Sequence, residues 1–440
     1  MHSERARQWV HIGSGSFALL LRVLTWWQAA ALAAVALAFN VVALPRVGGR
    51  RLYRPADEAR GFPIGIVLYP LAVLLLILIF PSRLDIVAAA WAVLALGDGA
   101  ATLAGQRARR RLPWNRDKTV KGTTAFIVFG GLGAVVLAWW VRPNVAPRPP
   151  LAFTIAAPIA AAIAAAFVET IPVRLDDNVS VPAAAAVVLW LASEMDSASW
   201  QAARGAVAAA LPWAIALNAL TAWGGHRART VSASGAIAGA IVGMLIYAGS
   251  GPGGWVLLFA AFLAASMTSR LGLQRKTLLG IAEERGGRRG AGNAIANCGV
   301  AVLAAIAAVT TPHAHGALVA FVAALAAGAS DTVASEIGKA WGTSTFLVTT
   351  FGRARPGTPG AMSLEGTAAG IVAAAALAAL GVALGLVPAS AIVPAVVGAT
   401  AGALVESALA ATLEGPGILN NDMLNFINTA VAAAVAVAIA

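Results

Sequence analysis

Two short polar motifs recur in a chain that is otherwise mostly apolar. GDGAATLAG occupies Gly97–Gly105, and SDTVASEIG occupies Ser330–Gly338. Both fit the pattern Asp-x-x-Ala-[Ser/Thr]-x-x-Gly, in which the first, fifth and eighth positions share one face of a helix. A carboxylate within a bilayer costs about 2.5–3.5 kcal/mol on insertion scales, and such a residue usually faces an interior cavity with a partner. Asp98 and Asp331 are therefore candidate functional residues.

Each motif is followed by a second one at the mouth of an apolar run. KTVKGTTAF begins at Lys118, and MSLEGTAAG begins at Met362. Gly122-Thr123 and Gly366-Thr367 are expected to open helices, where backbone N–H groups and the helix dipole favour a phosphate. Lys118, Arg116 and the run 109–111 could neutralise a triphosphate.

Two further elements complete the repeat in the same order. Glu169-Thr170 is followed by Asp176, Asp177 and Asn178, and Glu406-Ser407 by Glu414, Asn420, Asn421 and Asp422. Carboxylate and amide oxygens are the ligands that Mg²⁺ prefers, and Mg²⁺ in turn binds substrate phosphates. Phosphoryl transfer requires little more than such a metal, hydrogen-bond donors and positive charge held in place. The order predicts a diverged duplication with two sites for phosphoryl transfer.

Composition indicates the elements that must position these residues. Of 440 residues, 59% are hydrophobic and 11% charged, with mean hydropathy +0.80, whereas soluble domains carry about a quarter charged residues. Apolar runs of about 20 residues, long enough to cross a bilayer, recur throughout. We predict an all-α, polytopic integral membrane protein of two diverged homologous halves. The fourteen expected spans are 24–45, 63–80, 84–104, 122–141, 151–169, 180–193, 204–223, 231–248, 254–269, 291–310, 316–339, 364–385, 390–412 and 424–440, with a possible break near Gly328.

Charge in the expected loops alternates from one side to the other. Loops on one side carry 23 Lys and Arg residues and those on the other carry 3. The positive-inside rule places the basic loops, and with them every motif above, in the cytoplasm. We therefore expect a cytoplasmic (inner) membrane protein. The net charge of +12 is spread over short loops, which fits anionic headgroups and phosphates and argues against a nucleic-acid partner.

Other interpretations compete with a kinase. Small-residue stripes on membrane helices usually serve packing, and a single Asp at the end of a span is often interfacial. Internal repeats with polar breaks also mark secondary transporters, although those place polar residues deep in the bilayer from both sides. A cytidylyltransferase that makes a CDP-lipid is a third possibility, which pyrophosphate release would distinguish.

Residues 60–195 resemble the phytol kinase/dolichol kinase family, relatives of the phosphatidate cytidylyltransferases. The resemblance rests on GDGAATLAG, NRDKTVKGTTAF and VETIPVRLDDNVSVP. It implies an isoprenoid-alcohol kinase with CTP as the usual donor, although another nucleotide triphosphate and another divalent cation than Mg²⁺ remain open. Residues 1–60 are expected to form a tail, a signal-anchor helix and a basic loop.

Residues 205–440 resemble the membrane family that includes plant phytyl-phosphate kinase and many uncharacterised bacterial members. The matching elements are ASGAIAGAIVG, ERGGRRGAGNAIAN, ASDTVASEIG, RPGTPGAMSLEGT and NNDMLNFIN. This resemblance implies that the second half adds a phosphate to an isoprenyl phosphate. The whole chain would then convert an isoprenoid alcohol of the membrane to its diphosphate.

The resemblance and the repeat together define the candidate residues. We expect catalytic roles for Asp98, Glu169, Asp331 and Glu336. The expected metal ligands are Asp98, Asp177, Asn178, Asp331, Asn421 and Asp422. The expected nucleotide or phosphate ligands are Lys118, Thr119, Gly122, Thr123, Arg288, Arg289, Asn293, Asn297, Ser363, Gly366 and Thr367. Ser335 lies on the face of Asp331 and joins the second set.

Overall fold

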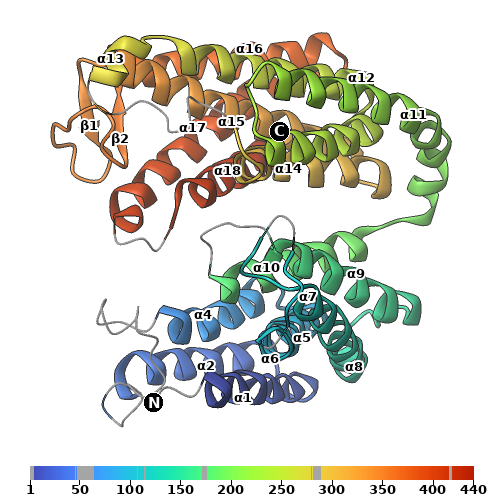
Figure 1. Ribbon diagram of the computed structural model, residues 1–440. Coiled ribbons are helices and arrows are strands. Elements are labelled where there is room, and N and C mark those ends of the chain that lie inside the picture. The colour runs from blue at the N-terminus through green and yellow to red at the C-terminus, as the bar shows by residue number, and fades with distance from the viewer. Residues whose placement is uncertain are drawn as a thin grey trace. The chain divides into compact units, whose positions relative to one another are not determined.

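The chain folds into two compact units, Met1–Ser193 and Glu194–Ala440 (Figure 1). The computed structural model describes residues 4–44, 46, 64–106, 108–112, 115–170, 176–278, 280, 289–415 and 419–440. Each unit has a hydrophobic core of its own. The described part of residues 1–60 belongs to unit 1.

Unit 1 is built from helices joined by short loops. Its α-helices are α1 (Glu4–Ser14), α2 (Trp26–Ala38), α4 (Ile64–Ile79), α5 (Leu84–Ala92), α6 (Gly99–Gly105), α7 (Val120–Ala125), α8 (Gly131–Val141), α9 (Leu151–Thr170) and α10 (Asp177–Glu194). Gly15–Arg22 and Arg142–Asn144 are 3₁₀ helices, and Phe39–Ala43, Val93–Asp98 and Phe126–Gly130 are π-helical. The sequence did not predict α1 or the 3₁₀ segment after it.

Unit 2 contains longer helices and one small hairpin. Its α-helices are α11 (Ser197–Arg227), α12 (Ala233–Arg270), α13 (Leu273–Leu278), α14 (Ala291–Thr310), α15 (Ala314–Trp341), α16 (Leu364–Ala383), α17 (Ile392–Leu409) and α18 (Asn421–Ile439). Ala389–Ala391 is a 3₁₀ helix and Ala410–Glu414 is π-helical. Strands β1 (Thr345–Leu347) and β2 (Ala361–Ser363) pair antiparallel, with Thr345 opposite Ser363. This hairpin departs from the all-α expectation.

Eleven helical segments of the described chain are long and apolar enough to span a membrane, fewer than the fourteen expected. The segments expected at 231–248 and 254–269 form the single helix α12, kinked at Gly251, whose φ of 70° is a left-handed value that glycine tolerates. The segments expected at 63–80 and 180–193 are helices α4 and α10 but fall outside this class. The break expected near Gly328 is absent, because α15 runs through it.

Many large apolar side chains face outward on these helices. Trp139, Ile163, Trp213 and Val372 are each at least half exposed. Lipid tails are as apolar as these side chains. A side chain that faces the bilayer therefore avoids the free-energy cost of exposing apolar surface to water. The distribution is that of an integral membrane protein.

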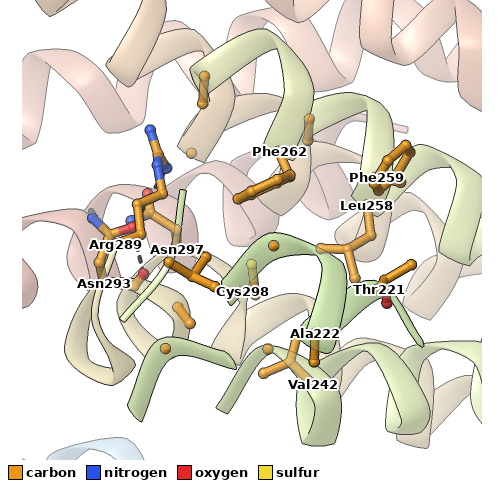
Figure 2. A pocket seen from close by; sticks show the side chains of 18 of the residues that line it. Thr221, Ala222, Val242, Leu258, Phe259, Phe262, Arg289, Asn293, Asn297 and Cys298 are labelled. Atoms are coloured by element: carbon orange, nitrogen blue, oxygen red, sulfur yellow. Dashed lines mark hydrogen bonds between the residues drawn. The ribbon is translucent and has the colours of Figure 1, made fainter. Parts of the chain in front are cut away.

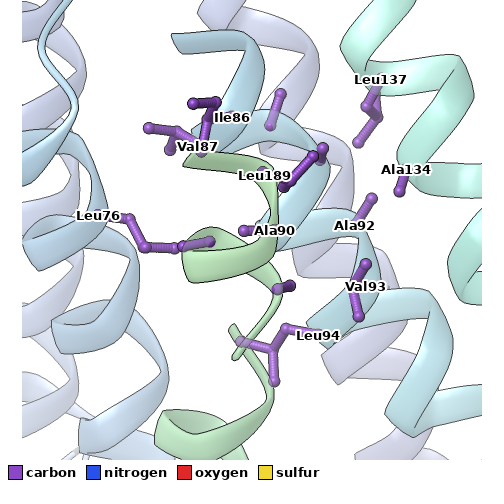
Figure 3. Close-up of a cluster of buried hydrophobic side chains, with 14 of the residues drawn as sticks. Leu76, Ile86, Val87, Ala90, Ala92, Val93, Leu94, Ala134, Leu137 and Leu189 are labelled. Atoms are coloured by element: carbon purple, nitrogen blue, oxygen red, sulfur yellow. The ribbon is translucent and has the colours of Figure 1, made fainter. Parts of the chain in front are cut away.

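One helix lies at the centre of unit 1. In the span Leu84–Gly105, 72% of the residues examined are buried, and in most other spans fewer than half are. Figure 3 shows Leu76 of α4, Leu137 of α8 and Leu189 of α10 around Ile86 and Ala90 of α5. The small side chains of α5 allow these neighbours to approach closely. The end of this buried span carries Asp98.

Helix α15 has the corresponding position in unit 2. In this span 67% of the residues examined are buried, and α15 contacts α12, α14, α16, α17 and α18. Its residues from Phe321 to Ser330 are all buried. Asp331 follows directly, so in each unit an Asp lies at the end of the most enclosed stretch.

Candidate functional sites

Three carboxylates meet in unit 1. Asp98 ends the π-helical turn Val93–Asp98, Glu169 lies in the last turn of α9, and Asp177 begins α10. One oxygen from each lies within 4.8 Å of the others. The predicted residues Asp98, Glu169 and Asp177 therefore come together from segments far apart in sequence. π-Helical turns are rare and occur often at functional sites.

Lys118 reaches into this cluster. Its Nζ lies 2.8 Å from Glu169 Oε1 and 3.2 Å from Asp177 Oδ2. Burial lowers the pKa of Lys118, but Asp177, Glu169 and Asp98 raise it by more, so its pKa lies above the ordinary lysine value. Lys118 is therefore charged at neutral pH and balances part of the negative charge of the cluster.

The start of α7 is held by contacts within the chain. Thr119 Oγ1 accepts a hydrogen bond from the Gly122 N–H at 3.0 Å, and the Val120 N–H donates to the Arg110 carbonyl. A Cβ on Gly122 would lie 3.0 Å from the Ala101 carbonyl oxygen of α6, so glycine is needed for this helix contact. Thr123 Oγ1 donates back to the Thr119 carbonyl. A phosphate at this helix start would have to compete with the cap.

Asn178 is anchored at the start of α10. Its Nδ2 donates to Asp176 Oδ1 at 2.7 Å and to the Gly65 carbonyl at 3.3 Å. Its Oδ1 is buried and has no hydrogen-bond partner among the described residues. A buried amide oxygen without a partner costs about 1–3 kcal/mol, so a ligand that donates to it is expected.

The sequence gave no indication of His11. This residue lies on α1, with Nε2 3.6 Å from Asp98 Oδ2 and its ring edge-on to Tyr69 at 4.7 Å between centroids. Gly99 of α6 leaves no room for a Cβ beside Ile12, which brings α1 against the Asp98 segment. A lone histidine in a charged tail has no pattern that could have revealed this.

Two acidic side chains are adjacent in unit 2. The carboxyl groups of Asp331 on α15 and Glu406 on α17 are within hydrogen-bonding range of each other. Asn428 Nδ2 of α18 donates to Glu406 Oε2 at 3.0 Å. Among the residues that the structure describes, no group of three metal-type side chains forms here. Asp331 and Glu406 nevertheless offer two carboxylates to one ligand.

Glu336 is engaged by two lysines one turn further along α15. The buried Lys276 of α13 donates to Oε2, and Lys339 Nζ lies 3.1 Å from Oε1. Both carboxylate oxygens of Glu336 are thus engaged in ion pairs, and Glu336 holds these two lysines in place. Lys276 was not among the predicted site residues.

Helix α16 begins as α7 does. Ser363 Oγ accepts from the Gly366 N–H at 3.0 Å, and the Leu364 N–H donates to the Ser344 carbonyl. A Cβ on Gly366 would overlap the Ala334 carbonyl oxygen of α15. Ser363 and Gly366 therefore fix the α15–α16 contact, and Thr367 follows within the first turn.

A pocket of about 160 Å³ adjoins the start of α14 (Figure 2). Arg289, Asn293 and Asn297 line one side, with Arg289 Nη1 3.4 Å from Asn293 Oδ1. Leu258 and Phe262 of α12 line another side. The Oδ1 of Asn297 is buried without a partner among the described residues. The pocket is polar toward α14 and apolar toward α12, and Arg288, a predicted ligand, lies outside the described residues.

The predicted ligands Asn421 and Asp422 lie in the first turn of α18. Asn420 caps α18 by accepting from the Met423 N–H at 3.0 Å, and Asn421 and Asp422 follow. The Asp422 carboxylate fills the space where a Cβ of Gly292 would lie, so it contacts the start of α14. Asp422 thus lies beside Gly292, the residue that precedes Asn293.

The fold and these sites define a polytopic integral membrane protein with clustered polar groups at the ends of its most buried helices. Residues 216–433 match the family described as integral membrane protein DUF92. An uncharacterized membrane protein of Synechocystis is 37% identical over 202 residues, 45% of this chain and 78% of the relative. The chain belongs to this family of integral membrane proteins.

Two further relatives extend the comparison. Protein VTE6, chloroplastic, of Arabidopsis thaliana is 35% identical over 214 residues, 47% of this chain and 64% of that protein. An uncharacterized membrane protein of Methanocaldococcus jannaschii is 31% identical over 213 residues, 48% of this chain and 87% of the relative. No solved structure matches the chain.

Proposed function

We propose that unit 2 is a membrane-embedded isoprenyl-phosphate kinase. The observation that carries this is the pocket beside α14, which offers Arg289 and two asparagines on one side and an aromatic, aliphatic helix face on the other. A lipid monophosphate likewise has a charged head group at one end and an apolar chain at the other. The family that residues 205–440 resemble includes plant phytyl-phosphate kinase, and the 35% identity to protein VTE6 supports the same substrate class.

The phosphate of the acceptor would be bound by Arg289, Asn293 and Asn297. Arginine presents several N–H donors in a fixed fork that matches phosphate oxygens. Asn293 Nδ2 would donate to a remaining oxygen, and so would the second Nδ2 hydrogen of Asn297, whose first is donated to the Asn293 carbonyl. The isoprenoid chain would lie along Leu258 and Phe262 of α12, where apolar surface is already removed from water.

The donor nucleotide would bind where Asp331 and Glu406 face Lys339. Two adjacent carboxylates of opposite helices fit a divalent cation such as Mg²⁺, which accepts hard oxygen ligands. When bound, Mg²⁺ would neutralise charge on the transferred phosphoryl group. Lys339, half-exposed beside Glu336, is placed to pair with a phosphate. The γ-phosphoryl group would move to an oxygen of the lipid phosphate, and the nucleoside diphosphate would leave.

We further propose that unit 1 performs the preceding step on an isoprenoid alcohol. In both units an Asp directly follows the most buried stretch of a helical span, and a hydroxyl-capped helix packs through glycine onto the carbonyl three residues after that Asp. In both units a Glu from a later helix lies beside the Asp. These likenesses support a duplication, with Asp98, Glu169 and Asp177 fitting a divalent cation and Lys118 fitting a phosphate.

CTP is the proposed donor for both units, because it is the usual donor in the family that residues 60–195 resemble. A nucleotide donor requires the sites to face the cytoplasm, as the distribution of basic loops predicts. The protein would then convert an isoprenoid alcohol to its diphosphate in two steps within one chain.

The experiment uses the full chain in lipid nanodiscs with Mg²⁺. Isoprenoid monophosphates and alcohols are offered with γ-labelled CTP, ATP, GTP or UTP, and lipid products are separated. Labelled diphosphate from the monophosphate is the expected result for unit 2. Absence of transfer from every nucleotide to every lipid would refute the proposal, and release of pyrophosphate with a CDP-lipid would identify a cytidylyltransferase instead.

A further inference from the structure

Unit 1 contains a cavity of about 530 Å³ that lies between α1, α2 and α4, next to the carboxylate cluster, and is partly open to the outside. Most of its wall is aliphatic, with Leu32, Ala33, Val73 and Ile77 among the lining residues. Exposed side chains such as Leu32 and Phe39 are among its lining residues, so an apolar ligand could enter it from the bilayer.

The polar residues of the wall connect the cavity to the carboxylate cluster. His11 and Asn178 both line it. His11 Nε2 is 3.6 Å from Asp98 Oδ2, and Asn178 is the next residue after Asp177. Two separate elements, α1 and α10, thus bring cavity-lining polar groups to members of the same cluster.

The size of the cavity indicates the length of its ligand. A cavity of about 150 Å³ holds one benzene ring, so 530 Å³ holds on the order of 20 carbon atoms. That volume fits one aliphatic chain of this length.

The charges at the polar end select the head group. The buried Oδ1 of Asn178 lacks a partner among the described residues and would accept a hydrogen bond from a hydroxyl. Asp98 and Asp177 nearby would repel an anionic phosphate. By contrast, the pocket of unit 2 presents Arg289, which suits a phosphate. The cavity of unit 1 therefore suits an uncharged alcohol, and the pocket of unit 2 suits its phosphate. Two successive phosphorylations require this difference in charge.

We propose that this cavity binds the acceptor of unit 1, a single isoprenoid chain of about 20 carbons with its hydroxyl at Asn178 and His11. The proposal rests on the proposed function of unit 1 for its substrate class. His11 and Asn178 position the hydroxyl at the edge of the Asp98, Glu169 and Asp177 cluster. The N-terminal helix α1 is in this view one wall of the substrate site.

A photoactivatable isoprenoid alcohol of about 20 carbons tests the proposal on the full chain in phosphatidylcholine nanodiscs. Labelling is expected on α2 and α4, with competition by the unlabelled alcohol. Ala33→Phe places a phenyl ring in the cavity and should reduce labelling by about tenfold or more. Ala34→Phe, on the exposed face of the same helix, should leave labelling unchanged. Ala33→Phe should also shift preference toward alcohols of about fifteen carbons, with phosphorylation of the monophosphate unchanged in both variants.

The outcomes separate this proposal from the proposed function. Equal competition by a fatty alcohol or by added diacyl lipid would overturn the site, because the cavity would then hold bulk lipid only. Normal alcohol phosphorylation and chain-length preference in Ala33→Phe would also overturn it, while leaving the kinase activity of unit 1 in place. Specific labelling of a chain that phosphorylates no alcohol would support the binding site and refute the kinase step.

Discussion

Lys118→Met tests the electrostatics of the cluster in unit 1. The wild-type Nζ bonds Glu169 and Asp177, and methionine keeps most of the side-chain volume without the charge. The substitution leaves three carboxylates whose nearest oxygens lie within 4.8 Å of one another. We expect a less stable unit 1 and loss of alcohol phosphorylation, with phosphorylation of the monophosphate by unit 2 retained.

The magnitude follows from the separation. Two unit charges 4.8 Å apart repel by about 3 kcal/mol at an effective dielectric constant of about 20. The Lys118 side chain is 28% exposed, so solvent screens part of this and we expect a loss of about 2–3 kcal/mol. For a unit of this size, that corresponds to a fall in Tm of roughly 5–10 °C.

Thermal unfolding in detergent with and without Mg²⁺ or Mn²⁺ measures both effects. Divalent cations should raise the Tm of Lys118→Met by more than that of the wild type, because they replace the missing positive charge. Lys121→Met, which removes an exposed lysine three residues away, is the matched control and should have the wild-type Tm. Equal losses in the two variants, or no added stabilisation by cations, would refute the assignment of Lys118 as the charge partner of the cluster.

Three further predictions follow from the two sites. Asp98→Asn should leave the alcohol unphosphorylated, whereas Asp331→Asn should let the monophosphate accumulate. Lipid product analysis should show a rate loss on the order of a hundredfold or more for the affected step in each variant. Loss of both steps in a folded Asp331→Asn variant would indicate one composite site. Arg289→Lys should raise the KM for the lipid monophosphate by about tenfold with a smaller change in kcat, since lysine cannot form the bidentate contact, and an unchanged KM would remove Arg289 from the phosphate site. Gly366→Ala should lower Tm by several degrees because its Cβ overlaps a backbone carbonyl, whereas Gly205→Ala, which meets nothing within 4 Å, should not; equal Tm values would contradict the α15–α16 contact.

Sequence patterns predicted the membrane class and most of the helices of this protein. Apolar runs of bilayer length indicate segments that prefer lipid to water. Helices such as α9, α14 and α16 were therefore expected close to where they lie. Hydropathy does not report backbone geometry, and the separate spans expected around Gly251 are one kinked helix. The hairpin β1–β2 lies in a polar loop that has no hydropathy signal.

The candidate sites were predictable to the extent that their residues repeat in order. Asp98, Glu169 and Asp177 were all selected from the duplicated pattern, and the structure brings them together. Asp331 and Glu406 were likewise placed in one pattern and lie side by side.

Only the tertiary structure determined which other residues contact these carboxylates. His11, the Lys276 pair with Glu336 and the cavity between α1, α2 and α4 depend on contacts between segments distant in sequence. The hydroxyl caps that occupy the Gly122 and Gly366 N–H groups depend on backbone geometry at one turn. Residue order specifies which side chains are present in each helix, but the distances that create a charge cluster or a cavity arise only when glycine and alanine surfaces bring the helices into contact.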